Sequence, residues 1–293
     1  MRLRRLAACG LALPLLLAGC SLLPTTRKLP VPKAPARVQD ATPKELVESI
    51  NKRWDALNTL TATVEIQATE LKTDKGLAKD FPSCRGYIVL RKPDMLRVAG
   101  TYLGAKVFDM ASNGHRFTLV IPLKDLAIEG SNTVKERSEN QMLNLRPDFF
   151  LDSIVVRGLD PKDEYMSTAD TLTVEDAAKK HLLSVPEYVL SVVRRNADSQ
   201  ELRLMRRITF HRDDLLPYGQ DIYDSNGNLE TQVTYSDYAE FSAGEYPSRV
   251  TILRPMEGIR LVMTVIRVQE NVDLPADEFE VQIPAGTKIQ KLE

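Results

Sequence analysis

Cysteine, histidine and aromatic residues are scarce in this 293-residue sequence, and each scarcity excludes a class of structure. Three cysteines and three histidines, scattered along the chain, build neither a disulfide framework nor a clustered metal site. An aromatic content of 6% disfavours a barrel embedded in a membrane, which carries girdles of aromatic side chains. Neither sign of charge dominates, since 39 basic residues stand against 40 acidic ones. We therefore expect no nucleic acid as a partner, because such binding depends on excess positive charge.

The sequence also lacks the short motifs of common enzymes. It contains neither a G-x-S-x-G nucleophile elbow nor a glycine-rich phosphate loop. His115, His181 and His211 lie far apart, in different kinds of segment. The stretch Asp224 to Asn228 is acidic and contains a glycine, but the glycine is not at the sixth position of a calcium loop. We therefore expect no enzymatic activity, no metal and no cofactor.

One long apolar run is present, and it lies at the N-terminus. It extends from Leu6 to Ala18 and follows three arginines, a layout typical of a secretory signal peptide. The run is too short to cross a bilayer as a helix, which takes roughly 20 apolar residues. We expect residues 1–19 to direct export and to be removed. The remaining chain would carry 39 − 3 = 36 basic residues against 40 acidic ones.

The residues around Cys20 carry a second signal. The stretch Leu17-Ala-Gly-Cys20 resembles the lipobox of bacterial lipoproteins, which implies that Cys20 is acylated and becomes the first residue of the mature chain. Ser21, in place of aspartate, implies sorting to the outer membrane, with the protein facing the periplasm. Two acyl chains would anchor the protein stably, since each buried CH₂ contributes about 0.8 kcal/mol. The alternative is an ordinary secreted protein with a chance cysteine.

A proline-rich segment separates Cys20 from the folded body. Residues 20–41 contain prolines at positions 24, 30, 32 and 35 and little that could form a core. This composition predicts a semi-rigid tether that reaches up to roughly 60 Å, at about 3.1 Å per residue. We expect the folded domain to occupy residues 42–293.

The folded domain is predicted to begin with a helix. Thr42, Pro43 and Glu45 form the pattern of a capping box with proline at the first helical position. Apolar residues then recur at helical spacing on one face, including Trp54. A helix with a single apolar stripe must pack on a partner surface.

Alternating apolar and polar residues then predict an antiparallel meander. Such segments run from about residue 59 to 121 and resume after about 185, where Asn226-Gly227 predicts a hairpin turn. The pattern breaks near 124–185, which we interpret as an insertion of helices and loops lying across the sheet. About ten antiparallel strands are expected to curl into an unclosed barrel or half-barrel, giving a mainly β fold with helices (α+β).

The strand at residues 258–268 is apolar on both faces. Ile259, Leu261, Met263 and Val265 occupy the face that we expect to look into the barrel. The other face carries apolar residues at positions 262, 266 and 268. It is expected to be covered by a helix, for which the helix with Trp54 is the candidate.

Four motifs, in order, resemble those of the LolA and LolB carriers of bacterial lipoproteins. The stretch LVESINKRWDALNTLTATVEI is similar to their opening helix and first strand. The segments at 86–93 and 112–122 are similar to two of their strand ends, and the segment at 279–286 is similar to their closing motif. The resemblance implies an unclosed β-barrel with a helical lid around an apolar cavity that takes up acyl chains.

The resemblance also implies roles for three residues. Lys92 matches an arginine that hydrogen-bonds the lid backbone in the closed state, although a lysine lacks the planar fork of arginine. Its alternative is a solvated lysine at a strand end. Leu103, with Tyr102 beside it, falls where the anchored carrier has a protruding, membrane-facing loop. The alternative there is a tight turn whose leucine folds back into the core.

Together these features predict an outer-membrane lipoprotein that binds acyl chains, lipoproteins or phospholipid in a barrel cavity and helps to insert them. A soluble periplasmic carrier would be its partner. The same architecture also serves proteins with other functions, so the fold alone does not identify the function of this chain. The alternative is a membrane-tethered sensor or interaction module that uses its surface to contact a partner.

Overall fold

A computed structural model describes residues 31–35, 37–72, 75–132, 146–176 and 181–292. The predicted signal peptide, Cys20 and the first part of the tether lie outside the described residues, so the expectations for them stay predictions. Within the described part of the chain, no helix has both the length and the apolar character needed to span a bilayer.

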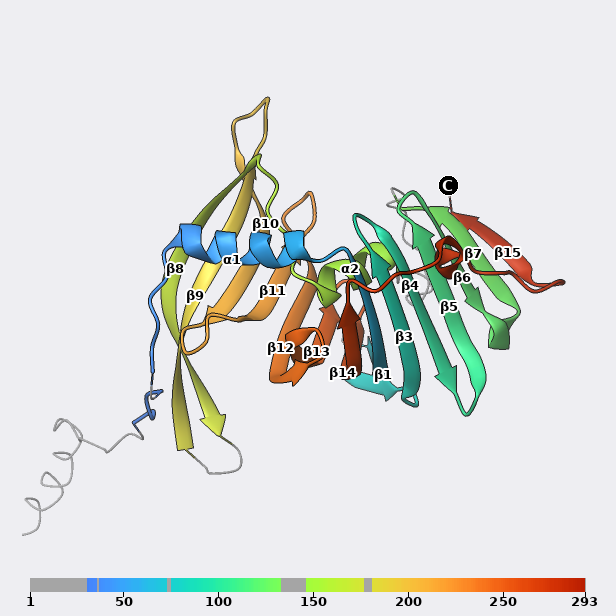
Figure 1. Ribbon diagram of the computed structural model, residues 1–293, viewed down its shortest axis with the longest axis horizontal. Coiled ribbons are helices and arrows are strands. Elements are labelled where there is room, and N and C mark those ends of the chain that lie inside the picture. The colour runs from blue at the N-terminus through green and yellow to red at the C-terminus, as the bar shows by residue number, and fades with distance from the viewer. Residues whose placement is uncertain (1–30, 36, 73–74, 133–145, 177–180, 293) are drawn as a thin grey trace, which may run out of the picture.

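The strands of the described residues form one continuous sheet (Figure 1). Its order is β15-β7-β6-β5-β4-β3-β1-β14-β13-β12-β11-β10-β9-β8, and β2 pairs with β1 beside this path. Neighbours are antiparallel except for β15 and β7, which are parallel. The bounds are β1 (Thr59–Lys72), β2 (Leu77–Asp80), β3 (Cys84–Arg91), β4 (Met95–Tyr102), β5 (Ala105–Asn113), β6 (Arg116–Ile121), β7 (Leu126–Ser131), β8 (Asp163–Asp176), β9 (His181–Arg195), β10 (Leu202–His211), β11 (Pro217–Tyr223), β12 (Leu229–Phe241), β13 (Gly244–Arg254), β14 (Ile259–Glu270) and β15 (Lys288–Leu292).

The sheet is unclosed, because β8 and β15 lie at its two ends. The predicted mainly β, antiparallel and unclosed architecture is therefore confirmed, but the strand count of about ten is wrong, since the described residues alone form fifteen strands. The region 124–185 accounts for part of the difference. Its described residues form β7, β8, the start of β9 and helix α2, whereas helices and loops were expected. Most side chains of β8 are exposed, so the apolar alternation that marks a half-buried strand is missing there.

Helix α2 (Pro147–Ile154) supplies the centre of the larger core. Four of its apolar side chains are buried against side chains of β1, β3, β4, β13 and β14. Phe149 and Phe150 lie with their ring centroids 4.1 Å apart. An eight-residue helix is too short to be stable alone, so this burial holds α2 in place.

Helix α1 (Pro43–Ala56) crosses the other half of the sheet, over β8 to β11 (Figure 1). The predicted capping box is present: the Glu45 amide donates to Thr42 Oγ1, and the Thr42 amide donates to the Glu45 carboxylate at 2.7 Å. The apolar stripe of α1 then packs on β9 and β10, where a second core cluster forms. Its buried members are Leu46, Val47, Ile50, Leu190, Val192, Ile208 and Phe210.

The prediction for the outer face of β14 is wrong. Ile259, Leu261, Met263 and Val265 are buried on the inner face, as expected. On the other face Ile266 is 51% exposed, because the helix with Trp54 packs on the inner side of the sheet. A register shift in the pairing with β1 also turns Val268 inward, where it is fully buried. A bulge of this kind reverses the alternation and is hard to read from sequence.

Candidate functional site

A cavity of about 790 Å³ lies at one end of the curved sheet. Its wall comes from β1 to β6, β14 and α2, together with the connections after β2 and β6. Most of its lining is apolar, and three charged side chains stand among it. The lining residues are Ile66, Ala68, Glu70, Lys79, Phe81, Pro82, Cys84, Tyr102, Val107, Phe108, Met110, Leu119, Ile121, Leu123, Lys124, Phe150 and Leu261.

The cavity reaches the surface at the ends of several strands. Tyr102 and Leu123 both line it and are themselves exposed, Leu123 to 77%. Leu77 of β2 and Leu103 of the β4–β5 turn are further exposed leucines at this end of the sheet. We call these four residues the apolar rim. Exposed apolar groups that gather at the mouth of a cavity suit contact with lipid or protein.

Leu103 occupies an unfavourable backbone conformation. It forms a two-residue hairpin turn with Gly104, and both residues have positive φ, 49° and 82°. This geometry suits asparagine or glycine, and a leucine with positive φ is uncommon. The side chain is 90% exposed, so the alternative in which it folds back into the core is wrong. A strained, fully exposed leucine supports a functional hypothesis for this turn.

Cys84 contributes a thiol to the cavity wall. It is the free cysteine among the described residues and is half-buried. Burial raises the pKa of this thiol, so it stays protonated at neutral pH and behaves as a small apolar group.

Lys92 lies at the C-terminal end of α1, away from the cavity lining. Its Nζ donates a hydrogen bond of 2.6 Å to the carbonyl oxygen of Trp54 and lies 4.4 Å from the centroid of the indole ring. A cation here also complements the negative end of the helix dipole. Lys92 therefore does hydrogen-bond to the backbone of a helix, and that helix is the N-terminal helix α1.

Replacing Lys92 with alanine is expected to loosen the last turn of α1. Loss of a charge-assisted hydrogen bond should lower the free energy of unfolding by about 1–2 kcal/mol, as measured by urea denaturation. Lys52→Ala, at an exposed lysine of the same helix, is the matched control and should change stability little. Equal losses in the two variants would assign no special role to Lys92.

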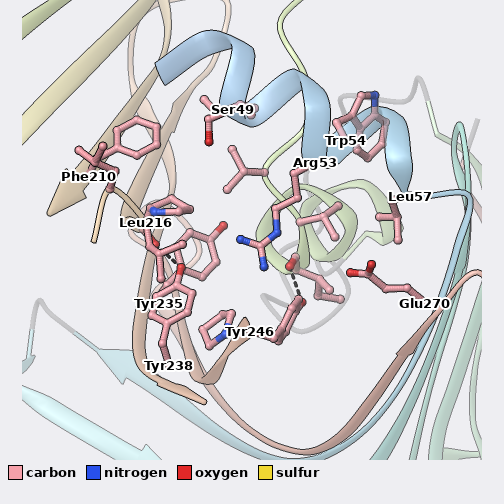
Figure 2. Close-up of a pocket in the computed structure, with 17 residues that line it drawn as sticks. Ser49, Arg53, Trp54, Leu57, Phe210, Leu216, Tyr235, Tyr238, Tyr246 and Glu270 are labelled. Atoms are coloured by element: carbon pink, nitrogen blue, oxygen red, sulfur yellow. Dashed lines mark hydrogen bonds between the residues drawn. The ribbon is translucent and has the colours of Figure 1, made fainter. Parts of the chain in front are cut away.

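A second, smaller cavity of about 80 Å³ lies beneath α1 (Figure 2). Arg53, Trp54 and Glu270 border it, together with Tyr235, Tyr238 and Tyr246, several apolar residues and Ser49. Tyr246 donates a hydrogen bond of 2.6 Å to the carbonyl oxygen of Ile154, and Tyr238 donates to that of Pro217. Burial raises the pKa of all three tyrosine hydroxyls. The small volume, and the polar groups that stand among the apolar side chains, suit water molecules better than an acyl chain.

The residues that the sequence predicted to line one cavity lie in three different places in the structure. Leu261 lines the large cavity, whereas Trp54 lines the small one. Ile259, Met263 and Val265 are packed in the core and line neither cavity. The prediction that these three residues line the large cavity is wrong, because their side chains are packed within the larger core cluster.

Several residues of the large cavity were not predicted. Ala68 could have been found, because it continues the inward alternation of Ala62, Val64 and Ile66 on β1. Phe81 and Leu123 lie in connections between strands, and Phe150 lies on α2. Their approach to one cavity depends on long-range pairing, which no local pattern encodes.

Solved structures with a similar fold are known. A LolA superfamily protein from Nitrosomonas europaea matches with a TM-score of 0.51 at 13% identity, over 83% of this chain and 99% of that protein. A Vibrio parahaemolyticus structure described as an outer membrane lipoprotein-sorting protein domain has a TM-score of 0.49 at 11% identity, over 80% and 94% of the two chains. No family model and no curated protein matches this sequence. The resemblance to the LolA and LolB carriers is thus confirmed in the fold.

Proposed function

We propose that this protein is a membrane-anchored carrier that shelters acyl chains in its large cavity and helps to deliver them to the outer membrane. Its cargo would be lipoproteins or phospholipid, and it would act without catalysis. The observation that carries the proposal is the apolar cavity of about 790 Å³ opening at an exposed apolar rim. A closed core would shelter no ligand, and a cavity without such a rim would lack a route to a membrane.

The cavity suits acyl chains on physical grounds. Ligand pockets of roughly 300–1,000 Å³ are lined mainly by apolar side chains. An acyl chain moved from water into such a lining gains about 0.8 kcal/mol for each buried CH₂. Lys79 and Lys124, which also border the cavity, offer positive charge near a headgroup that is left outside.

The site of action follows from the N-terminal sequence. Acylation at Cys20 would hold the protein on the outer membrane facing the periplasm, where a soluble carrier could hand over cargo. The apolar rim would then contact the bilayer and receive the acyl chains as they leave the cavity. Nonspecific partitioning of exposed leucines favours such contact, since each buries apolar area.

Binding of lipid is the direct test. A soluble form beginning at Ser21, purified gently from its host, would be analysed by native mass spectrometry followed by lipid extraction. Co-purifying phospholipid or acylated peptide is expected. A lipid-free protein that also fails to bind an added palmitoyl probe would refute the carrier proposal.

The second candidate function is a membrane-tethered sensor or interaction module. It is favoured by the long β8–β9 ribbon, which forms an unpaired edge of the sheet (Figure 1). Tyr165, Met166 and Leu172 are exposed on β8, and a free strand edge is able to pair with an extended peptide. A lipid-free protein in the test above would make this candidate the better account.

Leu103→Glu is expected to separate transfer from binding. A carboxylate at the tip of the β4–β5 turn should reduce delivery of a palmitoyl probe to vesicles by tenfold or more, because a charge resists entry into the bilayer. Binding of the probe in solution should not change, since Leu103 does not line the cavity. A fluorescence transfer assay measures the first and a titration measures the second.

Leu202→Glu provides the matched control. Leu202 is an exposed leucine at the start of β10, which does not border the large cavity. Transfer by this variant should equal that of the unchanged protein. Intact transfer by Leu103→Glu would remove the β4–β5 turn from the mechanism.

A further inference from the structure

The last part of the proline-rich tether is bound to the folded body. Lys33 forms two backbone hydrogen bonds with β9: its amide donates to the Leu182 carbonyl at 2.7 Å, and the Ser184 amide donates to the Lys33 carbonyl at 2.9 Å. This pairing lies next to β9 beyond the residues that pair with β10. We call residues 33–35 and 37–41 the strap, and its first residue, Lys33, thus adds a strand-like contact to the sheet.

Arg212 holds the other end of the strap. Its Nε donates to the Gln39 carbonyl at 3.1 Å, and its guanidinium forms an ion pair with Asp40. Its own carbonyl accepts a hydrogen bond of 2.6 Å from the Gln39 amide. The side chain of Gln39 also donates to the Asp213 carbonyl at 2.6 Å. Main-chain and side-chain groups of the strap therefore bind main-chain and side-chain groups of Arg212 and Asp213.

Tyr188 completes this contact. The guanidinium of Arg212 lies 4.7 Å from the centroid of the Tyr188 ring, within the range of a cation–π interaction. The Tyr188 hydroxyl donates to Asp40 at 3.3 Å and accepts from the Ala41 amide at 3.4 Å. The segment leading into α1 is thus fixed by a cation, an aromatic ring and backbone hydrogen bonds.

Docking of the strap shortens the free tether. From Cys20, only residues 20–32 would remain to span the gap to the membrane, about 40 Å at about 3.1 Å per residue. The composition alone predicted a reach of roughly 60 Å. A shorter tether restricts both the height of the body above the bilayer and its range of orientations.

The strap also gives the tether a direction. It runs down beside the sheet and meets β9 near the lower end of the β8–β9 ribbon in Figure 1. β1 and β4 run downward in the same view, so β2 and the β4–β5 turn lie at the lower end of the sheet (Figure 1). These elements carry Leu77, Tyr102 and Leu103 of the apolar rim. The start of the strap and these elements of the apolar rim therefore lie toward the same end of the body in this view.

We propose that the strap, held by Arg212, shortens the lipid tether and sets the apolar rim toward the membrane in which Cys20 is anchored. This inference rests on the proposed acylation of Cys20 for its membrane part only. The docking of the strap itself is independent of the anchor. Release of the strap would leave the anchor intact and let the body rotate away from the bilayer.

Hydrogen exchange tests the docking in the absence of any membrane. A soluble chain beginning at Ser21 would be compared with its Arg212→Ala and Asp40→Ala variants. Amide exchange in the strap should become at least tenfold faster in both, while exchange in β12 to β14 stays unchanged. Arg203→Ala, at an exposed arginine of β10, is the matched control and should leave the strap protected. Unchanged exchange of the strap in both test variants would refute the docking.

Energy transfer then tests the orientation on the lipidated full-length protein in phospholipid vesicles. A fluorophore would be attached at Leu77→Cys, in a Cys84→Ser background, with an acceptor lipid in the bilayer. Arg212→Ala should lower transfer efficiency relative to Arg203→Ala. Equal transfer, despite faster strap exchange, would refute the orienting role. Failure of the chain to become acylated would refute the anchor instead, and the exchange result would still stand.

Discussion

Ala68→Trp is expected to weaken binding of a palmitoyl probe by roughly 100-fold. Ala68 lies on β1, is partly buried and lines the large cavity, so an indole at this position would extend into space that the ligand needs. Each excluded CH₂ forfeits about 0.8 kcal/mol, and exclusion of three or four corresponds to roughly 100-fold in the dissociation constant. A fluorescence titration with the purified protein measures the change.

Gln67→Trp is the matched control for this experiment. Successive side chains of a strand point to opposite faces, and Gln67 is exposed. The same large side chain, one residue away, should leave the affinity unchanged. Equal binding by the Ala68→Trp variant would show that acyl chains do not occupy this cavity.

Asp109→Ala is expected to lower the free energy of unfolding by about 3 kcal/mol. Asp109 is almost fully buried and accepts two hydrogen bonds of 3.0 Å from Arg97 and one of 2.5 Å from Lys106. Arg97 also donates to the carbonyl oxygen of Glu278 at 2.9 Å, so the same group ties the C-terminal segment to β4. Removing the carboxylate takes the nearest anion from two cations and leaves the partly buried Arg97 only its longer ion pair with Glu278 at 3.8 Å.

Urea denaturation measures this loss, and Glu164→Ala is the control. Glu164 pairs with Arg195 at 2.8 Å, but both side chains are exposed, so its removal should cost about 0–1 kcal/mol. A similar small loss for both variants would mean that the Asp109 pair contributes no more than a surface ion pair.

The contribution of Asp109 also depends on pH. Burial alone would raise the pKa of this carboxyl, but hydrogen bonds and charges from Arg97 and Lys106 outweigh burial and hold the pKa below its ordinary value. A lowered pKa in the folded state stabilises the protein fully above the unfolded value of about 3.9, and this stabilisation is lost as the pH falls through the folded value. The difference between the unchanged protein and Asp109→Ala should therefore shrink below about pH 4.

Local signals predicted the local elements well. Thr42 and Glu45 marked the start of α1, and the capping box is present there. Asn226-Gly227 marked the turn between β11 and β12, which pair in the structure. These predictions succeed because caps and hairpin turns depend on neighbouring residues. β8 escaped prediction because it is held by backbone pairing with β9 and buries few side chains.

The position of the large cavity could not be predicted from the sequence, for a different reason. The sequence predicted an apolar interior and named four residues of β14 as its wall, but of these four Leu261 alone lines the large cavity, and the other three are packed in the core. The open space lies further along, among β1, β3, β4, β5 and β6. Whether an inward side chain meets another side chain or a void depends on how far the sheet curves and where α2 comes to lie.

The amino-acid sequence by itself determined the alternation that makes most strands, the cap of α1 and the family whose fold the chain shares. It also predicts an export signal and acylation of Cys20, and these expectations concern residues outside the described part of the chain. Only the tertiary structure decided that the cavity opens beside Leu103 and Leu123, that Lys92 contacts α1, and that Arg212 binds the strap. The physical reason is separation along the chain: Gln39 and Arg212 are 173 residues apart, and contacts of that range form only when the whole sheet has assembled.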